Sequence, residues 1–423
     1  MMNQLLTSLQ QPSIKFFLKE KKHRLKQIIR LVYSWRWQFS SLPSSKSSDV
    51  KFYYLGRKSE RTNTISFLGL DDLNASSTIS NSNSISDCKT TATSKAKVLV
   101  SEMPFPGAIC LPLNLSTVIS LKNQTIDDIL MGFEKRKRRL INCQVANFKL
   151  KKVTNIDDVI RLNEQMLKPF ANARYGQGAY HFPIEQLIEM TFKTGQFNLL
   201  LHNDKEVGCT IGHFSERNKK RYWQSDRMGF PEFIFSESQQ YRETNVVITY
   251  LQIQWAIANG FEYYDMGANA AYTEAGVLHN KRTFGGQLSL MGNYNYLYLK
   301  LPAAYAAKFY WQKPLFALED KAIVLHLGLL DGVSDSALLD RYKTLDFGGI
   351  EKVYLHFETQ CSENALMVIK SIFSQQNLPP LIVSANAYQS KSFEPAMLLV
   401  LCANLSLLSN SAALESLELL SLI

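Results

Sequence analysis

Several features that would fix a function at once are missing from this sequence of 423 residues. Its six cysteines lie far apart, and none has the CxxC or Cys/His spacing that zinc sites and disulfide frameworks use. No apolar run approaches the roughly 18 residues that a membrane span needs, and the best candidate, residues 396–403, is far too short. The first residues lack the basic start and apolar stretch of a secretory signal. These absences predict a reduced, cytoplasmic protein that holds no metal.

Basic charge is abundant, and it is concentrated in two short segments. The chain has 47 Lys and Arg residues against 37 Asp and Glu, which gives a net charge of +10. Eight basic side chains and a single acid stand between residues 15 and 36, and residues 135–139 read Lys-Arg-Lys-Arg-Arg. Such runs favour phosphate-bearing partners such as nucleic acid, acidic lipid or a nucleotide cofactor. A solvated helix face explains any single run equally well.

Length and composition predict a globular chain of two or three domains, because 46% of the residues are apolar and one domain takes roughly 100–200 residues. Residues 76–94 are rich in Ser, Thr and Asn and lack the apolar area that folding requires, so they mark the clearest boundary. The predicted organisation is a basic N-terminal extension (1–72), a linker (73–96), a main domain (97–302) and a C-terminal extension (303–423). The last segment is predicted to hold a small βαβ unit from residues 353–357, 362–375 and 381–385, followed by a helix from Pro395.

An amphipathic helix is predicted over residues 14–39. Leu25, Ile28 and Val32 fall at helical spacing, and basic residues surround this apolar stripe. A helix of this kind can lie on an anionic membrane surface, here the inner face of the membrane, or it can pack against the protein's own core. The pattern alone fits both, and packing against the core is the preferred interpretation.

The main domain carries an ordered series of helix and strand patterns. A helix over 126–142 is predicted to hold the basic run 135–139 at its C-terminal end, where the helix dipole favours positive charge. The series continues with a strand (145–153), two helices (155–167 and 183–193), a β-hairpin (198–202 and 206–214), a strand (221–225), a long helix (246–258), a short buried strand (262–266), a polar loop and a last strand (287–299).

The stretch from residue 255 to residue 286 is the most informative part of the chain. It reads as a helix end, a turn at Gly260, a buried strand and a polar loop that ends in Lys-Arg-Thr-Phe-Gly-Gly at residues 281–286. An acid, Asp265, and a base, Lys281, therefore stand at opposite ends of one irregular segment that follows a strand. Loops mounted on rigid elements often carry catalytic groups, so this segment is the predicted site.

These elements resemble the GNAT acyltransferase fold, and the closing segment resembles its FemAB-like branch, which includes BioF-type acetyltransferase domains. The resemblance covers about residues 97–300 and rests on three pieces. They are the basic helix 135–139 before the first strand, the helix-Gly-strand element 254–267, and the Gly…Lys-Arg-x-aromatic-Gly ending 276–286. The resemblance implies an α/β (α+β) fold with a mixed, mostly antiparallel sheet flanked by helices.

The resemblance also implies an N-acyltransferase that moves an acetyl or other acyl group from a coenzyme A thioester directly to the amine of a small molecule or peptide. The usual loop for the coenzyme A pyrophosphate, Gln/Arg-x-x-Gly-x-Gly/Ala at the start of a helix, is missing before Val246. Some FemAB-like proteins lack this loop and take an aminoacyl group from tRNA, so an aminoacyl-tRNA donor is the alternative. A third interpretation is a non-catalytic protein that binds nucleic acid or an anionic membrane on a degenerate GNAT fold.

Three residues are the candidates for catalysis. By similarity to the family's closing motif, Lys281 would stabilise the oxyanion of acyl transfer, although a surface lysine on a hairpin is the plain alternative. A general base should be a carboxylate or histidine near the acceptor. Asp226 and Asp265 follow the two strands that splay apart in this fold, and either could instead brace neighbouring backbone.

Six further residues are the candidates for binding. Arginines would bind the phosphates of the donor, and they could equally pair with acids nearby. Aromatic residues of the central strands would line the substrate groove or the core, and a histidine could shuttle a proton at the substrate. These candidates are Arg282, Arg138 and Arg139 for the donor and Trp223, Tyr264 and His279 for the substrate.

Overall fold

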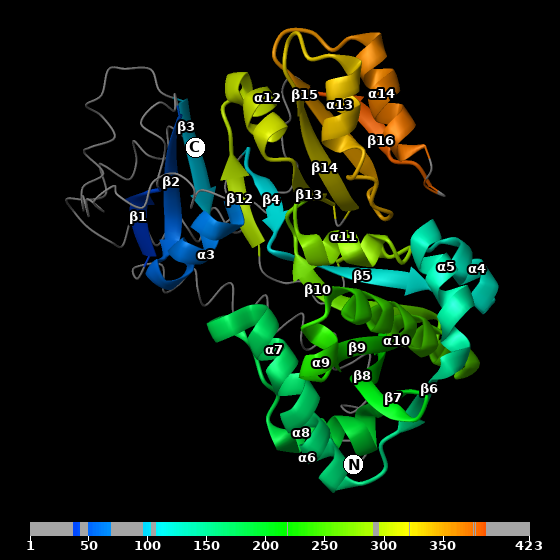
Figure 1. Cartoon of the computed structure of the whole chain (residues 1–423). Helices are drawn as coiled ribbons and strands as arrows, with labels where there is room; N and C mark the ends of the chain where they lie inside the picture. Colours follow the sequence, from blue (N-terminus) through cyan, green and yellow to red (C-terminus); the bar gives the residue numbers. More distant parts are fainter. Residues whose placement is uncertain are drawn as a thin grey trace, which may run out of the picture. The chain divides into compact units, whose positions relative to one another are not determined.

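A computed structural model describes residues 37–42, 50–68, 96–102, 107–217, 219–290, 296–320, 322–374, 376 and 378–385 (Figure 1). The described residues divide into two compact units. Unit 1 comprises Ser116–Ala268 and His279–Gln287, and unit 2 comprises the described residues of Glu20–Leu115, Asn269–Leu278 and Leu288–Ile423. Of the predicted helix over 14–39, the described part is a strand, since β1 (Trp37–Ser41) includes residues 37–39. The predicted linker and the helix from Pro395 lie outside the described residues.

The sheet of unit 1 has the strand order β11-β5-β10-β9-β8-β7-β6. Strands β6 to β9 pair antiparallel in sequence order, and β10 then joins β9 in parallel. This order of pairing is the mixed, mostly antiparallel sheet that the sequence predicted, and the fold class is confirmed. The strands are β5 (Asn114–Ser120), β6 (Phe148–Lys152), β7 (Gly195–His202), β8 (Lys205–Arg217), β9 (Lys220–Gly229), β10 (Tyr263–Ala270) and β11 (Gln287–Ser289).

Helices flank this sheet on both faces. Two of them continue into π-helical turns, over Asn163–Leu167 after α6 and over Met190–Thr194 after α8. The helices are α4 (Ile126–Met131), α5 (Lys135–Gln144), α6 (Ile156–Leu162), α7 (Lys168–Tyr175), α8 (Ile184–Glu189), α9 (Glu232–Phe235), α10 (Ser238–Ala258) and α11 (Gly276–Arg282), with 3₁₀ turns at Val145–Asn147 and Gly176–Gly178.

Local sequence explains several of these boundaries. The β7–β8 turn places Asn203 and Asp204 at φ 48° and 62°, a two-residue hairpin turn that these residue types tolerate. The Asn155 side chain caps α6 by accepting the N–H of Asp158 at 2.7 Å, which starts this helix at the predicted position. Both the hairpin and the start of this helix are therefore confirmed.

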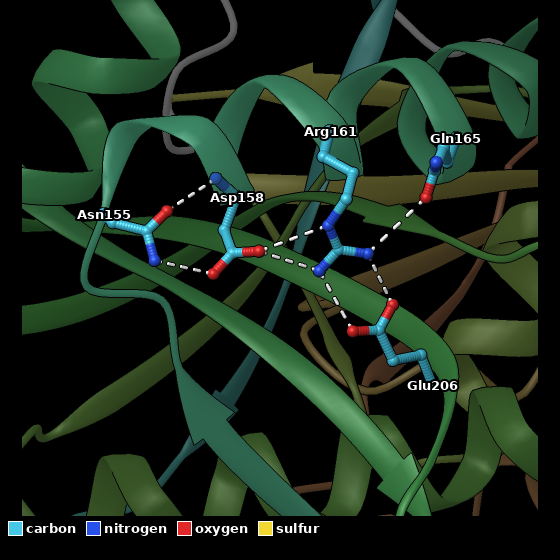
Figure 2. Close-up of polar contacts among 5 residues, drawn as sticks. All are labelled: Asn155, Asp158, Arg161, Gln165 and Glu206. Atoms are coloured by element: carbon cyan, nitrogen blue, oxygen red, sulfur yellow. Dashed lines mark hydrogen bonds and ion pairs between the residues drawn. The ribbon is translucent and has the colours of Figure 1, made fainter.

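An ion-pair cluster ties α6 to the start of β8, and Figure 2 shows it. The Arg161 guanidinium donates to Glu206 at 2.6 and 3.0 Å and to Asp158 at 2.8 and 3.2 Å. Asp158 also receives the amide of Asn155 at 2.7 Å. One side chain thus joins the first turn of a helix to a neighbouring hairpin.

The core of unit 1 lies on both faces of its sheet. One cluster packs α10 and the turn after it against the central strands, and the other packs α6 and α8 against β7 and β8. Trp223 stands at 4.6 Å between ring centroids from Trp255 of α10, in an edge-to-face arrangement. The second cluster includes Val159, Leu162, Leu187, Phe197, Leu199, Cys209 and Ile211.

The helix predicted over 126–142 is broken, which is a correction. α4 ends at Met131 with Gly132 as its C-cap, and α5 begins at Lys135. Phe133 lies between them with 2% of its surface exposed and packs edge-to-face against Phe284, with 5.2 Å between ring centroids. The gain from burying this side chain favours the break. The basic run 135–139 consequently opens a helix, where the dipole does not favour positive charge, and does not close one.

Two further predictions in the main domain need correction. The segment before Phe284 contains α11 rather than only a polar loop. The predicted strand over 287–299 consists of two separate strands, because β11 ends at Ser289 and β12 (Tyr296–Lys300) starts after residues that the structure does not describe.

Unit 2 has its own sheet, with the strand order β1-β2-β3-β12-β4-β13-β14-β15-β16. The predicted βαβ unit is confirmed, since β15 and β16 pair in parallel across α14. The sheet joins residues that the sequence assigned to the N-terminal extension, the main domain and the C-terminal extension. Its elements are β2 (Val50–Arg57), α3 (Lys58–Leu68), β3 (Ala96–Ser101), β4 (Ile109–Pro112), α12 (Ala303–Gln312), β13 (Leu315–Glu319), β14 (Ala322–Leu329), α13 (Asp335–Tyr342), β15 (Lys352–Phe357), α14 (Glu363–Phe373) and β16 (Leu381–Ser384).

No helix in the described ranges is long and apolar enough to cross a membrane.

Candidate functional site

The two parallel strands at the centre of unit 1 pair over only a short distance. Residues Tyr263 to Asp265 of β10 face Tyr222 to Gln224 of β9, and both strands then continue without further pairing to each other among the described residues. A sheet that parts in this way exposes the backbone and side chains at the end of the paired region. The predicted site residues Asp226, Asp265 and Lys281 all lie near this point.

Asp226 stands on a β-bulge. Ile211 of β8 faces Arg227 and the next residue, Gly212, faces Ser225, so Asp226 is the extra residue of β9. Bulges redirect a side chain and are common beside active sites. Here the bulge lies just past Gln224, the last residue of β9 that pairs with β10.

The redirected Asp226 carboxylate meets a histidine that the sequence had not marked. Its Oδ2 lies 2.5 Å from Nδ1 of His213 on β8. An ionised carboxylate only accepts hydrogen bonds, so Nδ1 carries the proton and Nε2 is the basic nitrogen of the neutral ring. The His213 side chain is 30% exposed, which leaves it open to a ligand. This histidine and carboxylate form a pair of the kind that accepts protons in acyl transfer.

Asp265 has a different environment, because both of its oxygens are engaged by the protein. Oδ2 accepts Nη1 of Arg217 at 2.9 Å, and Oδ1 accepts the backbone N–H of Gly267 at 2.8 Å. With 1% of its surface exposed, Asp265 has the geometry of the bracing role rather than of a base that meets substrate.

Lys281 reaches the same turn from α11. Its Nζ donates to the carbonyl oxygen of Gly267 at 2.9 Å. Burial lowers the pKa of Lys281 from its ordinary value to about 8, and the nearby charge of Arg174 lowers it further while Asp265 opposes both. At neutral pH the amine is therefore mostly charged, but close to the point at which it loses its proton. A cation in this position suits the stabilisation of a developing oxyanion.

Two more arginines border this part of the sheet. Arg227, next to the bulge, stacks over the rings of Tyr180 and Phe182 at 5.6 and 5.1 Å. Arg174 at the end of α7 donates to the Tyr241 hydroxyl at 2.5 Å. Neither arginine forms an ion pair with a carboxylate in the described part of the chain. Of these two arginines, Arg174 is close enough for its charge to act on Lys281.

The basic start of α5 packs beside the end of α11. The backbone N–H of Glu134 donates to the carbonyl of Thr283 at 2.8 Å, and Lys137 lies 3.9 Å above the ring of Phe284. Burial lowers the pKa of Lys137 to about 8. This contact places the predicted donor-binding residues of both helices on neighbouring elements of unit 1, namely Arg138, Arg139 and Arg282, together with His279.

The aromatic candidates for the substrate groove are core residues, which is a correction. Trp223 and Tyr264 are 1% and 0% exposed and face α10. The Tyr264 hydroxyl donates to Gln252 of that helix. Side chains alternate along a strand, so Gln224 and Asp265 lie on the face of the sheet opposite to Trp223 and Tyr264. Gln224 and Asp265 are the partners of Arg217.

The loop that the GNAT resemblance would place before Val246 falls at the start of α10. Residues 230–238 contain no glycine, and the N-cap position is Glu237, whose side chain makes no capping hydrogen bond. A carboxylate at this position repels a phosphate. Within the described ranges, no group of three or more His, Cys, Asp or Glu side chains could hold a metal ion.

No family model and no curated protein sequence matches the chain. Solved structures with the GNAT fold do match it. The C-terminal DUF2156 domain of a putative lysylphosphatidylglycerol synthetase from Agrobacterium fabrum is 12% identical, with a TM-score of 0.32, and the match covers 65% of this chain and 87% of that one. L-PGS from Bacillus licheniformis is 13% identical with a TM-score of 0.31, and the match covers 63% of this chain and 84% of that one. FemX is 10% identical with a TM-score of 0.33, and the match covers 64% of this chain and 90% of that one. These are similarities of fold.

Proposed function

We propose that the protein is an N-acyltransferase that passes an acyl group directly from its donor to an amine acceptor. The observation that carries this proposal is that the His213–Asp226 pair and the Lys281 amine both lie near the point where β9 and β10 part. Acyl transfer needs a proton acceptor and a positive group for the oxyanion, and these side chains supply one each.

The reaction follows from these roles. The acceptor amine attacks the acyl carbonyl carbon and gives its proton to Nε2 of His213, and Asp226 stabilises the imidazolium that forms. Lys281 stabilises the negative oxygen of the tetrahedral intermediate. The bond from the carbonyl carbon to the leaving oxygen or sulfur then breaks, and His213 returns the proton to the leaving group. No covalent enzyme intermediate is required.

Two donors fit this scheme, a coenzyme A thioester and an aminoacyl-tRNA. The lack of glycine at the start of α10 and the Glu237 carboxylate at its N-cap disfavour the pyrophosphate of coenzyme A. The basic residues of α5 and α11 suit a polyanion such as tRNA. These observations support a second candidate function, in which the donor is an aminoacyl-tRNA. Arg138, Arg139 and Arg282 are the residues proposed to contact the phosphates of this tRNA.

Binding of the donor by the full chain tests the proposal. Calorimetry against acetyl-CoA, free coenzyme A and charged tRNA should show one class of donor bound, and binding of charged tRNA should weaken as salt rises. The variant Arg138→Gln/Arg139→Gln should weaken tRNA binding, whereas Lys205→Gln on the β7–β8 hairpin serves as a matched control. Absence of binding by all three ligands would contradict an acyltransferase and leave the non-catalytic interpretation.

A further inference from the structure

One arginine connects the two parts of the proposed site, which are the His213–Asp226 pair and the Lys281 amine. Arg217 is the last residue of β8, and its guanidinium touches a side chain of the neighbouring strand β9 and one of β10, the strand beyond it. Its side chain is 11% exposed, and the ring of Tyr222 lies beneath it at 5.0 Å. The Tyr222 ring against its face and the two hydrogen bonds at its edge fix the plane of the guanidinium.

A series of hydrogen bonds, here called the first arm, runs from Arg217 to His213. Nη2 donates to Oε1 of Gln224 at 2.6 Å, so the amide of Gln224 must point its Nε2 the other way. That nitrogen donates to Oδ1 of Asp226 at 3.2 Å. The second carboxylate oxygen, Oδ2, is thereby directed to Nδ1 of His213. Each hydrogen bond in this arm has its direction set by the guanidinium, which can only donate.

A second series of hydrogen bonds, the second arm, runs from Arg217 to Lys281. Nη1 donates to Oδ2 of Asp265, and the other oxygen of this carboxylate holds the N–H of Gly267. Gly267 has φ +81°, a left-handed conformation that directs its carbonyl oxygen to Nζ of Lys281 at 2.9 Å. The position of the Lys281 amine thus depends on a turn that the Arg217–Asp265 pair holds.

From this geometry we infer that Arg217 is a positioning residue that sets the orientation of the His213–Asp226 pair and of the Lys281 amine together. The inference rests on the proposed function of those groups. A buried ion pair that only stabilises the sheet would need Asp265 alone. The planar fork of arginine instead satisfies Asp265 and Gln224 at once, which a lysine ammonium cannot do with the same geometry.

Two variants separate positioning from folding. Gln224→Met removes the first arm and keeps the buried Arg217–Asp265 pair, and Arg217→Lys keeps the positive charge beside Asp265 and removes the fork. Both are expected to fold. The expected result is a fall in kcat of about 10- to 100-fold with KM little changed, because the acceptor still binds but the reacting groups are misplaced. Gln186→Met on α8 and Arg161→Lys on α6 are the matched controls, and both should keep the wild-type kcat.

A second readout does not need turnover. In the full chain, the proton on Nδ1 of His213 should give a strongly hydrogen-bonded nuclear magnetic resonance signal, and Gln224→Met should shift it or speed its exchange. An unchanged signal and an unchanged kcat in both variants would overturn the inference. If no donor supports turnover while Arg217→Lys still alters the His213 signal, the positioning role of Arg217 stands and the proposed function alone fails.

Discussion

At the scale of single residues, Lys281 carries a property that can be measured directly. The residue is only partly exposed in unit 1, and burial of its amine lowers the pKa to about 8, so its charge is present at neutral pH and is lost as the pH rises through about 8. A role as the cation for an oxyanion therefore predicts a specific alkaline limit of activity.

We expect the rate of acyl transfer to fall above pH about 8 in the wild-type protein, because the folded-state pKa of Lys281 is lowered to about 8. Lys281→Arg should keep activity at higher pH, since the guanidinium stays charged. Lys281→Ala should lower kcat by about 100- to 1000-fold at pH 7. The measurement is the pH profile of kcat for the three proteins; a wild-type rate in Lys281→Ala would remove this residue from the mechanism.

A second residue-scale feature is the backbone of Gly267. Its φ of +81° is one that residues with a Cβ atom rarely adopt, and an added Cβ would lie 3.4 Å from the carbonyl oxygen of Ser225 and 3.9 Å from Nζ of Lys281.

Gly267→Ala is expected to lower the free energy of unfolding of unit 1 by about 1–2 kcal/mol through backbone strain and to lower kcat as well. Gly178→Ala is the control, since its added Cβ would meet no atom within 4 Å. Denaturant unfolding and steady-state rates of both variants check the prediction. Equal stability of Gly267→Ala and Gly178→Ala would show that the turn relaxes without strain.

Residue identity and spacing could predict one part of the site and not the other. Asp226, Asp265 and Lys281 follow strands or close a motif, so the sequence alone places them near each other. His213 and Arg217 could not be identified in this way, because their partners lie on neighbouring strands and depend on the pairing of β8 with β9 and on the bulge. Polar residues at alternating positions of β8 were the available signal.

At the scale of secondary-structure elements, features set by adjacent residues were predicted well. The β7–β8 hairpin and the Asn155 cap depend on two to four neighbouring residues. The break between α4 and α5 depends on Phe133 meeting Phe284, about 150 positions along the chain, and local helical propensity cannot report such a contact. The helical form of α11 was missed within the polar loop for the same reason, since buried Leu278 anchors it in a core cluster.

The cluster of Figure 2 gives a prediction at this scale. Arg161 and Glu206 join α6 to β8 through a bidentate pair, but both side chains are more than a third exposed, so solvent screens the interaction. A double-mutant cycle of Arg161→Met and Glu206→Gln should give a coupling energy of about 0.2–1 kcal/mol that declines with salt. A coupling near zero at low salt would show that this pair does not stabilise the docking of α6.

At the scale of the whole molecule, the two units respond to pH through different groups. In unit 2, Nδ1 of His326 and Nε2 of His356 lie 2.9 Å apart, and both buried rings pack against Tyr310 of α12, while that of His326 also packs against Tyr354 of β15. Burial lowers the pKa of His356 to about 4 and that of His326 well below its ordinary value, where the partner histidine lowers it further.

Unit 2 should therefore lose stability in acid. The unfolded histidines bind protons below about pH 6.5, whereas the folded ones stay neutral, so the free energy of unfolding falls as the pH drops from about 6.5 toward 4. The slope is at most about 1.4 kcal/mol per pH unit for each histidine. Denaturant unfolding of the wild type and of His356→Gln checks this; the variant should show a shallower slope, and an equal slope would place the acid sensitivity elsewhere.

The His213–Asp226 pair is proposed to take the proton of the acceptor in an acyl transfer. The most direct measurement is the single-turnover rate of the full chain with acetyl-CoA and with charged tRNA, for the wild type, His213→Gln and Asp226→Asn. With its donor, the wild type should transfer the acyl group to an amine, and each variant should be slower by about 100- to 10,000-fold at pH 7 while still binding that donor. Transfer at the wild-type rate by His213→Gln would show that this histidine does not take the proton of the acceptor.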